Sequence, residues 1–201
     1  MGQQVVVHLS LIEHVGPSMV HGIVDHIGYD QLDVLYKYTV SDFMNMQIPQ
    51  AKAVLLVQGL ADHRMLIKEL ALVERYKAVV ITHWDFEYPD LLKQIHIPPP
   101  ILYVQGDPSV LKSPKMLACV GARNAHSYTK DVLNELVSPL IAQGFVVVSG
   151  GAAGADTFAH QLALDQGGKT VVVVGSGLCY VYPATNTKLF AQVVQKGGTV
   201  V

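Results

Sequence analysis

Three apolar segments of this chain each run directly into a short turn that contains glycine. Residues 116–120 lead into Gly121-Ala-Arg123, residues 145–148 into the turn 149–156, and residues 170–174 into Gly175-Ser-Gly177. Apolar runs without alternation are typical of parallel strands that are buried on both faces. Helical patterns follow these turns, so the sequence predicts a doubly wound α/β fold with a mostly parallel sheet.

The three turns should meet, because the carboxyl ends of parallel strands lie at one edge of a sheet, where open α/β sheets bind ligands. Free backbone N–H groups and helix N-termini at such an edge suit an anion, above all phosphate. Arg123 follows the first turn, where its guanidinium could hold a phosphate through two parallel hydrogen bonds. The predicted phosphate-binding residues of the turns are Gly121, Arg123, Ser149, Gly150, Gly151 and Gly154.

Several familiar sites do not fit these residues. The turn 149–154 lacks the first glycine of a dinucleotide fingerprint, and no carboxylate ends the next strand to hold a ribose, which argues against NAD. No Gly-Lys-Ser/Thr follows the turn, so a phosphate-binding P-loop is excluded. The nine histidines are scattered without metal-ligand spacing, and no nucleophile elbow is present. We therefore expect no metal, no cofactor and no catalytic residue.

The helices after the turns carry two polar residues that need an interpretation. Asp156 begins one helix, where we expect it to cap free N–H groups or to fix the loop, and His160 is expected to be a packed helix histidine. The preceding helix should start at Ser127 as N-cap and kink at Pro139. The predicted helices end at glycines and cover residues 127–141, 156–166 and 185–196.

Residues 1–72 show apolar residues at helical spacing, interrupted at Gly16-Pro17 and Gly28. They predict a small helical domain, either a plain packing domain, which we prefer, or a SAM-like helix-hairpin-helix that binds nucleic acid. Strands are expected at 77–82 and 101–105, with a helix from Asp85 through Ile95 between them. The α/β domain should occupy residues 73–201.

Composition separates the two halves of the chain. Residues 1–111 hold 7 Lys/Arg and 12 Asp/Glu, a charge of −5, whereas residues 112–201 hold 7 and 4, a charge of +3, which gives the total of −2. The positive excess lies with the glycine turns and weakly favours an anionic ligand. Two cysteines, no signal-peptide pattern and no apolar run of about 18 residues indicate a cytoplasmic protein that does not span a membrane.

Taken together, these motifs resemble the DNA-processing protein DprA (Smf) family. The resemblance rests on Gly121-Ala-Arg123, the turn 149–156 with Ala159-His160, Gly175-x-Gly-Leu178, Tyr182-Pro183, and upstream Tyr88-Pro89 and Pro99-Pro-Ile-Leu-Tyr103. It implies a Rossmann-like domain that binds single-stranded DNA, acts as a homodimer when full length and loads the RecA recombinase during natural transformation. It also implies that Arg123 lines the DNA pocket and that Lys188 replaces a lysine that the family places after Tyr-Pro.

The same resemblance marks two departures and one alternative. Gly151 and Ala155 are smaller than the leucine and isoleucine that the family carries there. The last residues, 199–201, predict a strand with an unpaired edge in a C-terminally truncated chain. The alternative is an enzyme or sensor of nucleotide-like ligands, similar to nucleoside-monophosphate phosphoribohydrolases. Those enzymes are expected to carry a Pro-Gly-Gly-x-Gly-Thr-x-x-Glu pattern. The turn 149–156 of this chain lacks the glutamate, so we expect a non-enzymatic protein.

Overall fold

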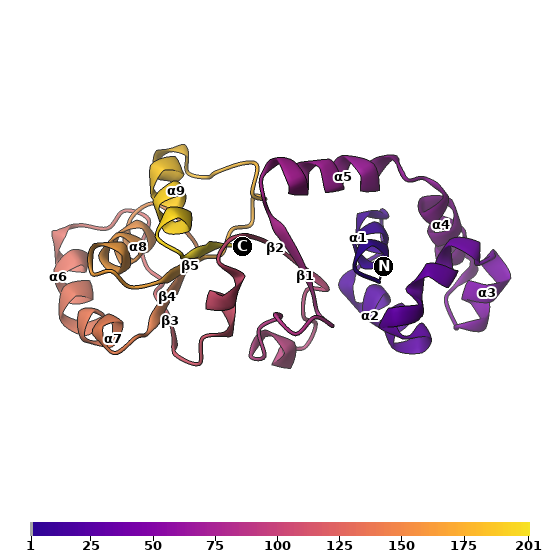
Figure 1. The fold of residues 1–201 in the computed structure, drawn as a ribbon, viewed down its shortest axis with the longest axis horizontal. Coiled ribbons are helices and arrows are strands. Elements are labelled where there is room, and N and C mark those ends of the chain that lie inside the picture. The colour runs from indigo at the N-terminus through magenta and orange to yellow at the C-terminus, as the bar shows by residue number, and fades with distance from the viewer. Residues whose placement is uncertain (1) are drawn as a thin grey trace. The chain divides into compact units, whose positions relative to one another are not determined.

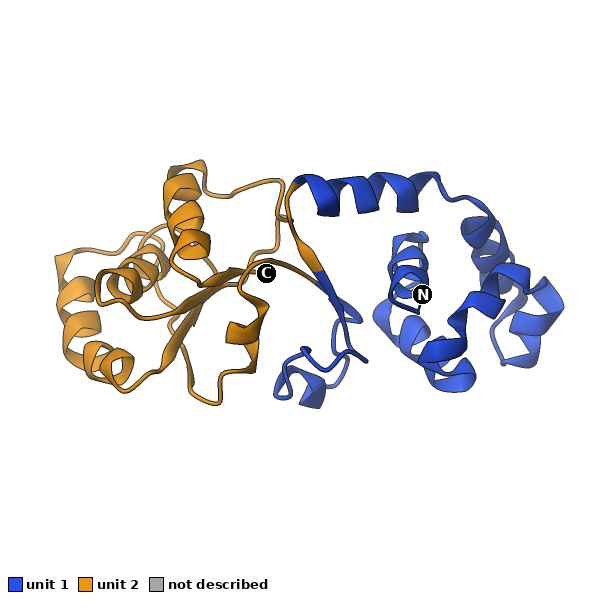
Figure 2. Ribbon diagram, viewed as in Figure 1, with its two compact units in different colours: residues 1–75, 80–102 blue, residues 76–79, 103–201 orange. Residues whose placement is uncertain are grey.

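The computed structural model describes residues 2–201, which divide into two compact units (Figure 2). The first unit contains the residues up to Arg75 together with residues 80–102, and the second contains residues 76–79 and 103–201. The division between domains that we predicted at residues 72 and 73 remains a prediction, because compactness by itself does not show which segments fold independently.

The first unit is built from short helices, as the sequence predicted. They are α1 (Gly2–Leu11), α2 (Pro17–Ile27), the 3₁₀ segment η1 (Tyr29–Lys37), α3 (Val40–Asn45), α4 (Gln50–Ala61) and α5 (Arg64–Arg75). Pro17 occupies the first turn of α2, where a missing N–H costs nothing, and Thr39 caps α3 in a reciprocal pair with Asp42. One apolar core, which includes Val6, Leu9, Ile23, Phe43 and Leu56, holds the helices together.

The segment after β1 (Val79–Thr82) corrects one prediction. The helix expected from Asp85 through Ile95 does not form, and the chain makes turns with only the 3₁₀ segment η2 (Leu92–Gln94). Leu91 is 69% exposed, so the apolar residues that suggested a helix do not define a buried face. The buried Tyr88 instead donates a hydrogen bond of 2.8 Å to the carbonyl of Pro99, which fastens the segment to the proline run behind it.

Side chains of the helices hold the same segment. Gln3 donates to the carbonyl of Val80 at 2.8 Å, and the Tyr29 hydroxyl donates to the Asp85 carboxylate at 3.0 Å. Trp84 stacks on the ring of Tyr29 with their centroids 5.7 Å apart. These contacts explain why residues 80–102 belong to the helical unit although the sequence pattern associates them with the sheet.

The sheet has six strands in the order β1-β2-β6-β5-β4-β3. Besides β1 these are β2 (Ile101–Gly106), β3 (Met116–Ala118), β4 (Val146–Ser149), β5 (Thr170–Val172) and β6 (Thr199–Val200). Figure 1 labels the strands β1 to β5. The pairs β3–β4, β4–β5 and β5–β6 are parallel, whereas β2 runs antiparallel to β6. The mostly parallel α/β fold is thus confirmed. The unpaired edge that we expected at residues 199–201 is wrong, because β6 pairs with β5 on one side and with β2 on the other.

Four helices and two 3₁₀ segments complete the second unit: η3 (Pro108–Lys112), α6 (Ser127–Leu136), α7 (Ser138–Ala142), α8 (Ala155–Asp165), η4 (Ala184–Asn186) and α9 (Thr187–Gln195). The kink predicted at Pro139 is a break between α6 and α7. Ser127 is the first residue of α6 rather than its N-cap, a position that His126 takes without a side-chain hydrogen bond.

Two apolar clusters attach these helices to the strands. Phe190 and Val193 of α9 pack with Val172 of β5 and Val200 of β6, and Ala159 of α8 lies in the cluster around Val147 of β4, which includes Val137 and Ile141. Both central valines, Val147 and Val172, are fully buried, as continuous apolar strands require. Among residues 2–201, no helix combines the length and the apolar composition that a membrane span needs.

Candidate functional site

The three glycine turns meet at the carboxyl edge of the sheet, as the parallel strand order requires. The Ser149 hydroxyl donates to the carbonyl of Cys119 at 2.6 Å, and the amide of Ala155 donates to the carbonyl of Ala122 at 3.1 Å. On the other side, the amide of Val173 donates to the carbonyl of Ser149 at 2.8 Å. The turn after β4 is therefore hydrogen-bonded to the segments that follow β3 and β5.

Glycine is required where the first two turns touch. Gly154 has φ +84°, and a Cβ at this position would overlap the carbonyl oxygens of Ala122 and Arg123. A Cβ on Gly121 would lie 2.6 Å from the Cβ of Ala155. Because both close approaches involve the Arg123 turn, the start of α8 fixes the backbone from which the Arg123 side chain projects.

Two cations near this edge are not used by the fold. Arg123 and Lys188 are both exposed, and within residues 2–201 neither side chain forms an ion pair or a hydrogen bond. Lys188 is the second residue of α9, two positions after Asn186, which is bonded to the glycine loop of residues 149–154. Lys130 of α6 is differently placed, because its ammonium lies over the Phe158 ring, 4.6 Å from the centroid.

Several polar groups of the glycine loop form hydrogen bonds with neighbouring residues of the protein. The amide of Ala152 donates to Oδ2 of Asp156 at 3.2 Å, and its carbonyl accepts from the Thr157 hydroxyl at 2.8 Å. Asn186 donates through Nδ2 to the carbonyl of Gly151 at 2.9 Å and to the Thr157 hydroxyl at 2.8 Å. The loop-fixing role predicted for Asp156 is confirmed.

Predicted phosphate-binding residues of this loop are partly enclosed. Ser149 and Gly151 are buried, and the Ser149 hydroxyl is already bonded to Cys119. A Cβ on Gly151 would lie 2.6 Å from Cζ of Phe190, so this ring fills the space of the larger residue that the resemblance led us to expect. The binding roles of Ser149, Gly150, Gly151 and Gly154 therefore stay predictions, with their backbone groups as the only available contacts.

Sequence reasoning missed Asn186. Its side chain is buried and joins the start of α9 to the loop after β4, two segments that are 34 residues apart in the chain. The available signal was an asparagine directly before an apolar helical pattern, which is the usual position of an N-cap. In the structure Asn186 makes no side-chain cap on α9 and bonds to the glycine loop instead.

The titratable groups of the edge do not form acid–base machinery. Burial lowers the pKa of His160 to about 4, so this histidine is neutral near pH 7. Burial first, and then the charge of Asp156, raises the pKa of the Cys119 thiol above its usual value, which keeps it protonated and unreactive. Among residues 2–201, no three His, Cys, Asp or Glu side chains are grouped so that they could hold a metal ion.

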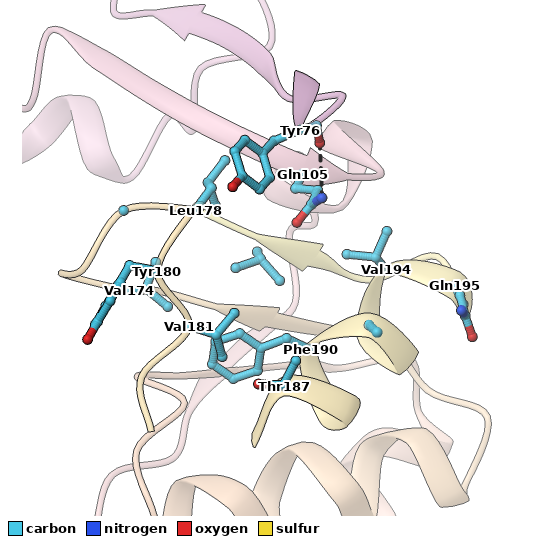
Figure 3. Close-up of a pocket in the computed structure, with 13 residues that line it drawn as sticks. Tyr76, Gln105, Val174, Leu178, Tyr180, Val181, Thr187, Phe190, Val194 and Gln195 are labelled. Atoms are coloured by element: carbon cyan, nitrogen blue, oxygen red, sulfur yellow. Dashed lines mark hydrogen bonds between the residues drawn. The ribbon is translucent and has the colours of Figure 1, made fainter. Parts of the chain in front are cut away.

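Three exposed aromatic rings lie in the segments that follow the first and third turns. Tyr128 is 75% exposed at the start of α6, and Tyr180 and Tyr182 are 69% and 62% exposed in the loop that follows the third turn. This loop borders a pocket of about 350 Å³ (Figure 3). In the close-up, Tyr76 and Leu178 lie on one side of the pocket and Phe190 and Val181 on the other. Flat, exposed rings of this kind can stack on nucleobases.

Comparison with known proteins shows which family the chain resembles. The family model for DNA recombination-mediator protein A matches residues 79–201. The DNA processing protein DprA of Bacillus subtilis is 36% identical over 103 residues, which are 51% of this chain and 35% of that protein. DprA of Streptococcus pneumoniae is 31% identical over 175 residues, which are 77% of this chain and 61% of that protein.

Two solved structures are similar as well. The X-ray structure of DprA from Streptococcus pneumoniae matches with a TM-score of 0.75 at 26% identity, covering 98% of this chain and 66% of that one. DprA from Helicobacter pylori, described for its single-stranded DNA binding mode, matches with a TM-score of 0.52 at 28% identity over 62% and 55% of the two chains. This chain thus spans between 35% and 66% of the lengths of these relatives. It belongs to the DNA recombination-mediator protein A family, whose curated members are called DprA or Smf.

Proposed function

We propose that this protein binds single-stranded DNA through its phosphates at the carboxyl edge of the sheet, with Arg123 as the main charged contact. The observation that carries the proposal is an exposed guanidinium without a partner in the fold, on a turn that Gly154 and Ala155 hold in place. A fixed backbone lowers the cost of ordering the side chain on binding, and a guanidinium can hold a phosphate through two hydrogen bonds. Gly121 and Lys188 would complete the contact.

Stacking would supply the remaining affinity. Tyr128, Tyr180 and Tyr182 are exposed in segments that follow the first and third turns, and bases of any identity can stack on them. Phosphate contacts and stacking carry little sequence information, so binding should be nearly independent of base sequence. The single-stranded DNA binding described for the relative from Helicobacter pylori supports this assignment.

The finer role is proposed from the family. A recombination mediator that holds single strands would protect incoming DNA in the cytoplasm and load RecA on it during transformation, acting as a homodimer in its full length and without catalysis. The nucleotide-hydrolase alternative finds no support at the edge, because the Asp156 carboxylate is bonded to the Ala152 amide and His160 is neutral.

The test compares two charge reversals on opposite edges of the sheet. Arg123→Glu replaces an attraction by a repulsion and should weaken binding of a labelled oligothymidine about 10- to 100-fold in fluorescence anisotropy. Arg123→Lys should recover only part of the affinity, because an ammonium lacks the two-pronged geometry. Lys115→Glu is the matched control, since Lys115 lies directly before β3, at its amino end, and is exposed.

Melting curves for each variant separate binding from folding. Arg123→Glu and Arg123→Lys should melt within a few degrees of the wild type, because Arg123 is exposed. Lys115→Glu should melt somewhat lower, because it loses the hydrogen bond to the Gln143 carbonyl and the contact with the Phe145 ring, so its binding is compared at a temperature where it is folded. If folded Arg123→Glu binds the oligonucleotide as tightly as the wild type, the proposed site is wrong. Equal losses for Arg123→Glu and Lys115→Glu would indicate a diffuse effect of net charge instead of a site.

A further inference from the structure

A carboxylate lies where a Rossmann-like loop would normally hold a phosphate. Asp156 is the second residue of α8, is 7% exposed, and accepts a hydrogen bond of 3.2 Å from the amide of Ala152 in the glycine loop. The same oxygen, Oδ2, lies 3.1 Å from the position that a Cβ on Gly150 would take. Helix N-termini preceded by glycine turns offer such amides to phosphate groups, but here the protein's own anion takes one.

The charge of Asp156 has no counter-ion. Across residues 2–201, no lysine, arginine or histidine forms an ion pair with it. Its influence reaches two neighbours, because it contributes to raising the pKa of the Cys119 thiol and partly opposes the lowering of the pKa of His160. The Asp156 carboxylate therefore lies buried at the N-terminus of α8, beside the ends of β3 and β4, without an ion-pair partner among the described residues.

One further amide and two carbonyls at the loop are also bonded within the protein. The amide of Ala155 donates to Ala122, and the carbonyls of Gly151 and Ala152 accept from Asn186 and Thr157. A phosphate that entered the loop would have to displace the carboxylate or lie against it, and both charges would be poorly solvated there. The exposed guanidinium of Arg123 is under no such constraint.

We infer that Asp156 is a specificity-determining residue, whose carboxylate makes the glycine loop reject the terminal phosphate of free nucleotides and leaves anion binding to Arg123. The DNA part of this inference rests on the proposed function. The rejection of nucleotides rests on the geometry of the loop alone, so the two parts can be tested separately.

The experiment removes the charge and keeps the shape. Asp156→Asn retains an oxygen that can accept from the Ala152 amide, so the loop should stay closed. Adenosine monophosphate should then bind at least about ten-fold more tightly than to the wild type in calorimetry, because a repulsion at contact distance is gone. Adenosine, which lacks the phosphate, should gain nothing. Asp165→Asn, at the other end of α8, makes the same change in net charge and should leave both affinities unchanged.

Oligothymidine binding provides the second readout. Its affinity should rise no more than about three-fold in Asp156→Asn, because the phosphodiester is held outside the loop and feels the charge through solvent. The inference is overturned if folded Asp156→Asn binds adenosine monophosphate no better than the wild type, or if Asp165→Asn gains as much. If Asp156→Asn does not fold, Asp156→Ser replaces it, since a hydroxyl can also accept from Ala152. If no variant binds oligothymidine while Asp156→Asn gains the nucleotide, the proposed function fails and the inference about the loop stands.

Discussion

At the scale of single residues, the protonation of His160 is decided by its hydrogen bonds and its burial. The Thr170 hydroxyl donates to the carbonyl of Val147 at 2.9 Å, so it can only accept at its 2.7 Å contact with Nδ1 of His160. Nδ1 therefore carries the proton, and Nε2 is a buried lone pair without a partner. Protonation of Nε2 would bury a positive charge and an N–H group that has no hydrogen-bond acceptor. This explains why burial lowers the pKa of His160 to about 4.

This histidine should make the second unit sensitive to acid. Its pKa is lower in the folded chain than in the unfolded chain, so the unfolded chain binds the extra proton first as the pH falls. The free energy of unfolding should decrease between pH 6.5 and about 4, by about 3 kcal/mol in total. Urea unfolding at pH 7 and pH 4.5 measures the effect. The pH dependence should be flatter in His160→Gln, which removes the buried imidazole.

Single residues also show what the sequence could predict about the site. Residue type and position were enough to assign Asp156 to the loop and His160 to the packed interior, because both follow from a helix that starts directly after a glycine turn. The role of Asn186 was not accessible in the same way. Its hydrogen bonds go to Gly151 and Thr157, and only the packing of α9 beside the loop after β4 brings these groups together.

At the scale of elements, the junction between α8 and the Arg123 turn is the most constrained contact of the site. Gly154 and Gly144 have nearly the same positive φ, +84° and +83°, but only at Gly154 would a Cβ meet other atoms. Gly144→Ala should cost about 1 to 2 kcal/mol, from left-handed strain alone. Gly154→Ala should cost clearly more and should also weaken oligothymidine binding, because Ala122 and Arg123 must move.

Denaturant unfolding of the two glycine variants, with anisotropy for DNA, checks this pair. The coupling of the glycine loop to the Arg123 turn would be contradicted if both variants lost the same stability and kept wild-type affinity.

Elements were predicted well where local sequence decides them and poorly where distant contacts do. The strands β3, β4 and β5 are apolar runs, and their existence and parallel order followed from composition and turns. The burial predicted for them holds for β4 and β5 but is wrong for β3, which is the edge strand and only partly buried, with Val120 88% exposed after it. The segment 85–95 has helical apolar spacing, but Tyr88 is bonded to Pro99 and Trp84 packs on Tyr29, contacts that a periodicity does not reveal. The antiparallel pairing of β2 with β6 is likewise a contact between residues far apart in the chain.

At the scale of the whole molecule, the two units do not follow a single cut in the sequence. The chain leaves the helical unit after Arg75, returns for residues 80–102 and leaves again. A boundary inferred from composition assumes that each domain is one continuous stretch of the chain. Residues 80–102 break this assumption, because Gln3 and Tyr29 bond to them at Val80 and Asp85. The position of the cations was easier to predict, because the positive excess of residues 112–201 includes both Arg123 and Lys188.

The charge of the whole chain sets the salt dependence of binding. With a net charge of −2 and few free cations at the site, single-stranded DNA should engage roughly two to four phosphates, and the slope of log affinity against log salt should be about −1.5 to −3 at ~0.7 per phosphate. Arg123→Ala should reduce the steepness of that slope by about 0.7, since one phosphate contact is lost. Lys115→Ala should leave the slope unchanged, because Lys115 donates to the carbonyl of Gln143 and lies at the amino end of β3. Anisotropy titrations over a range of salt concentrations measure all three slopes. A slope far steeper than −3 would mean that a broad cationic surface, and not the strand-end turns, holds the DNA.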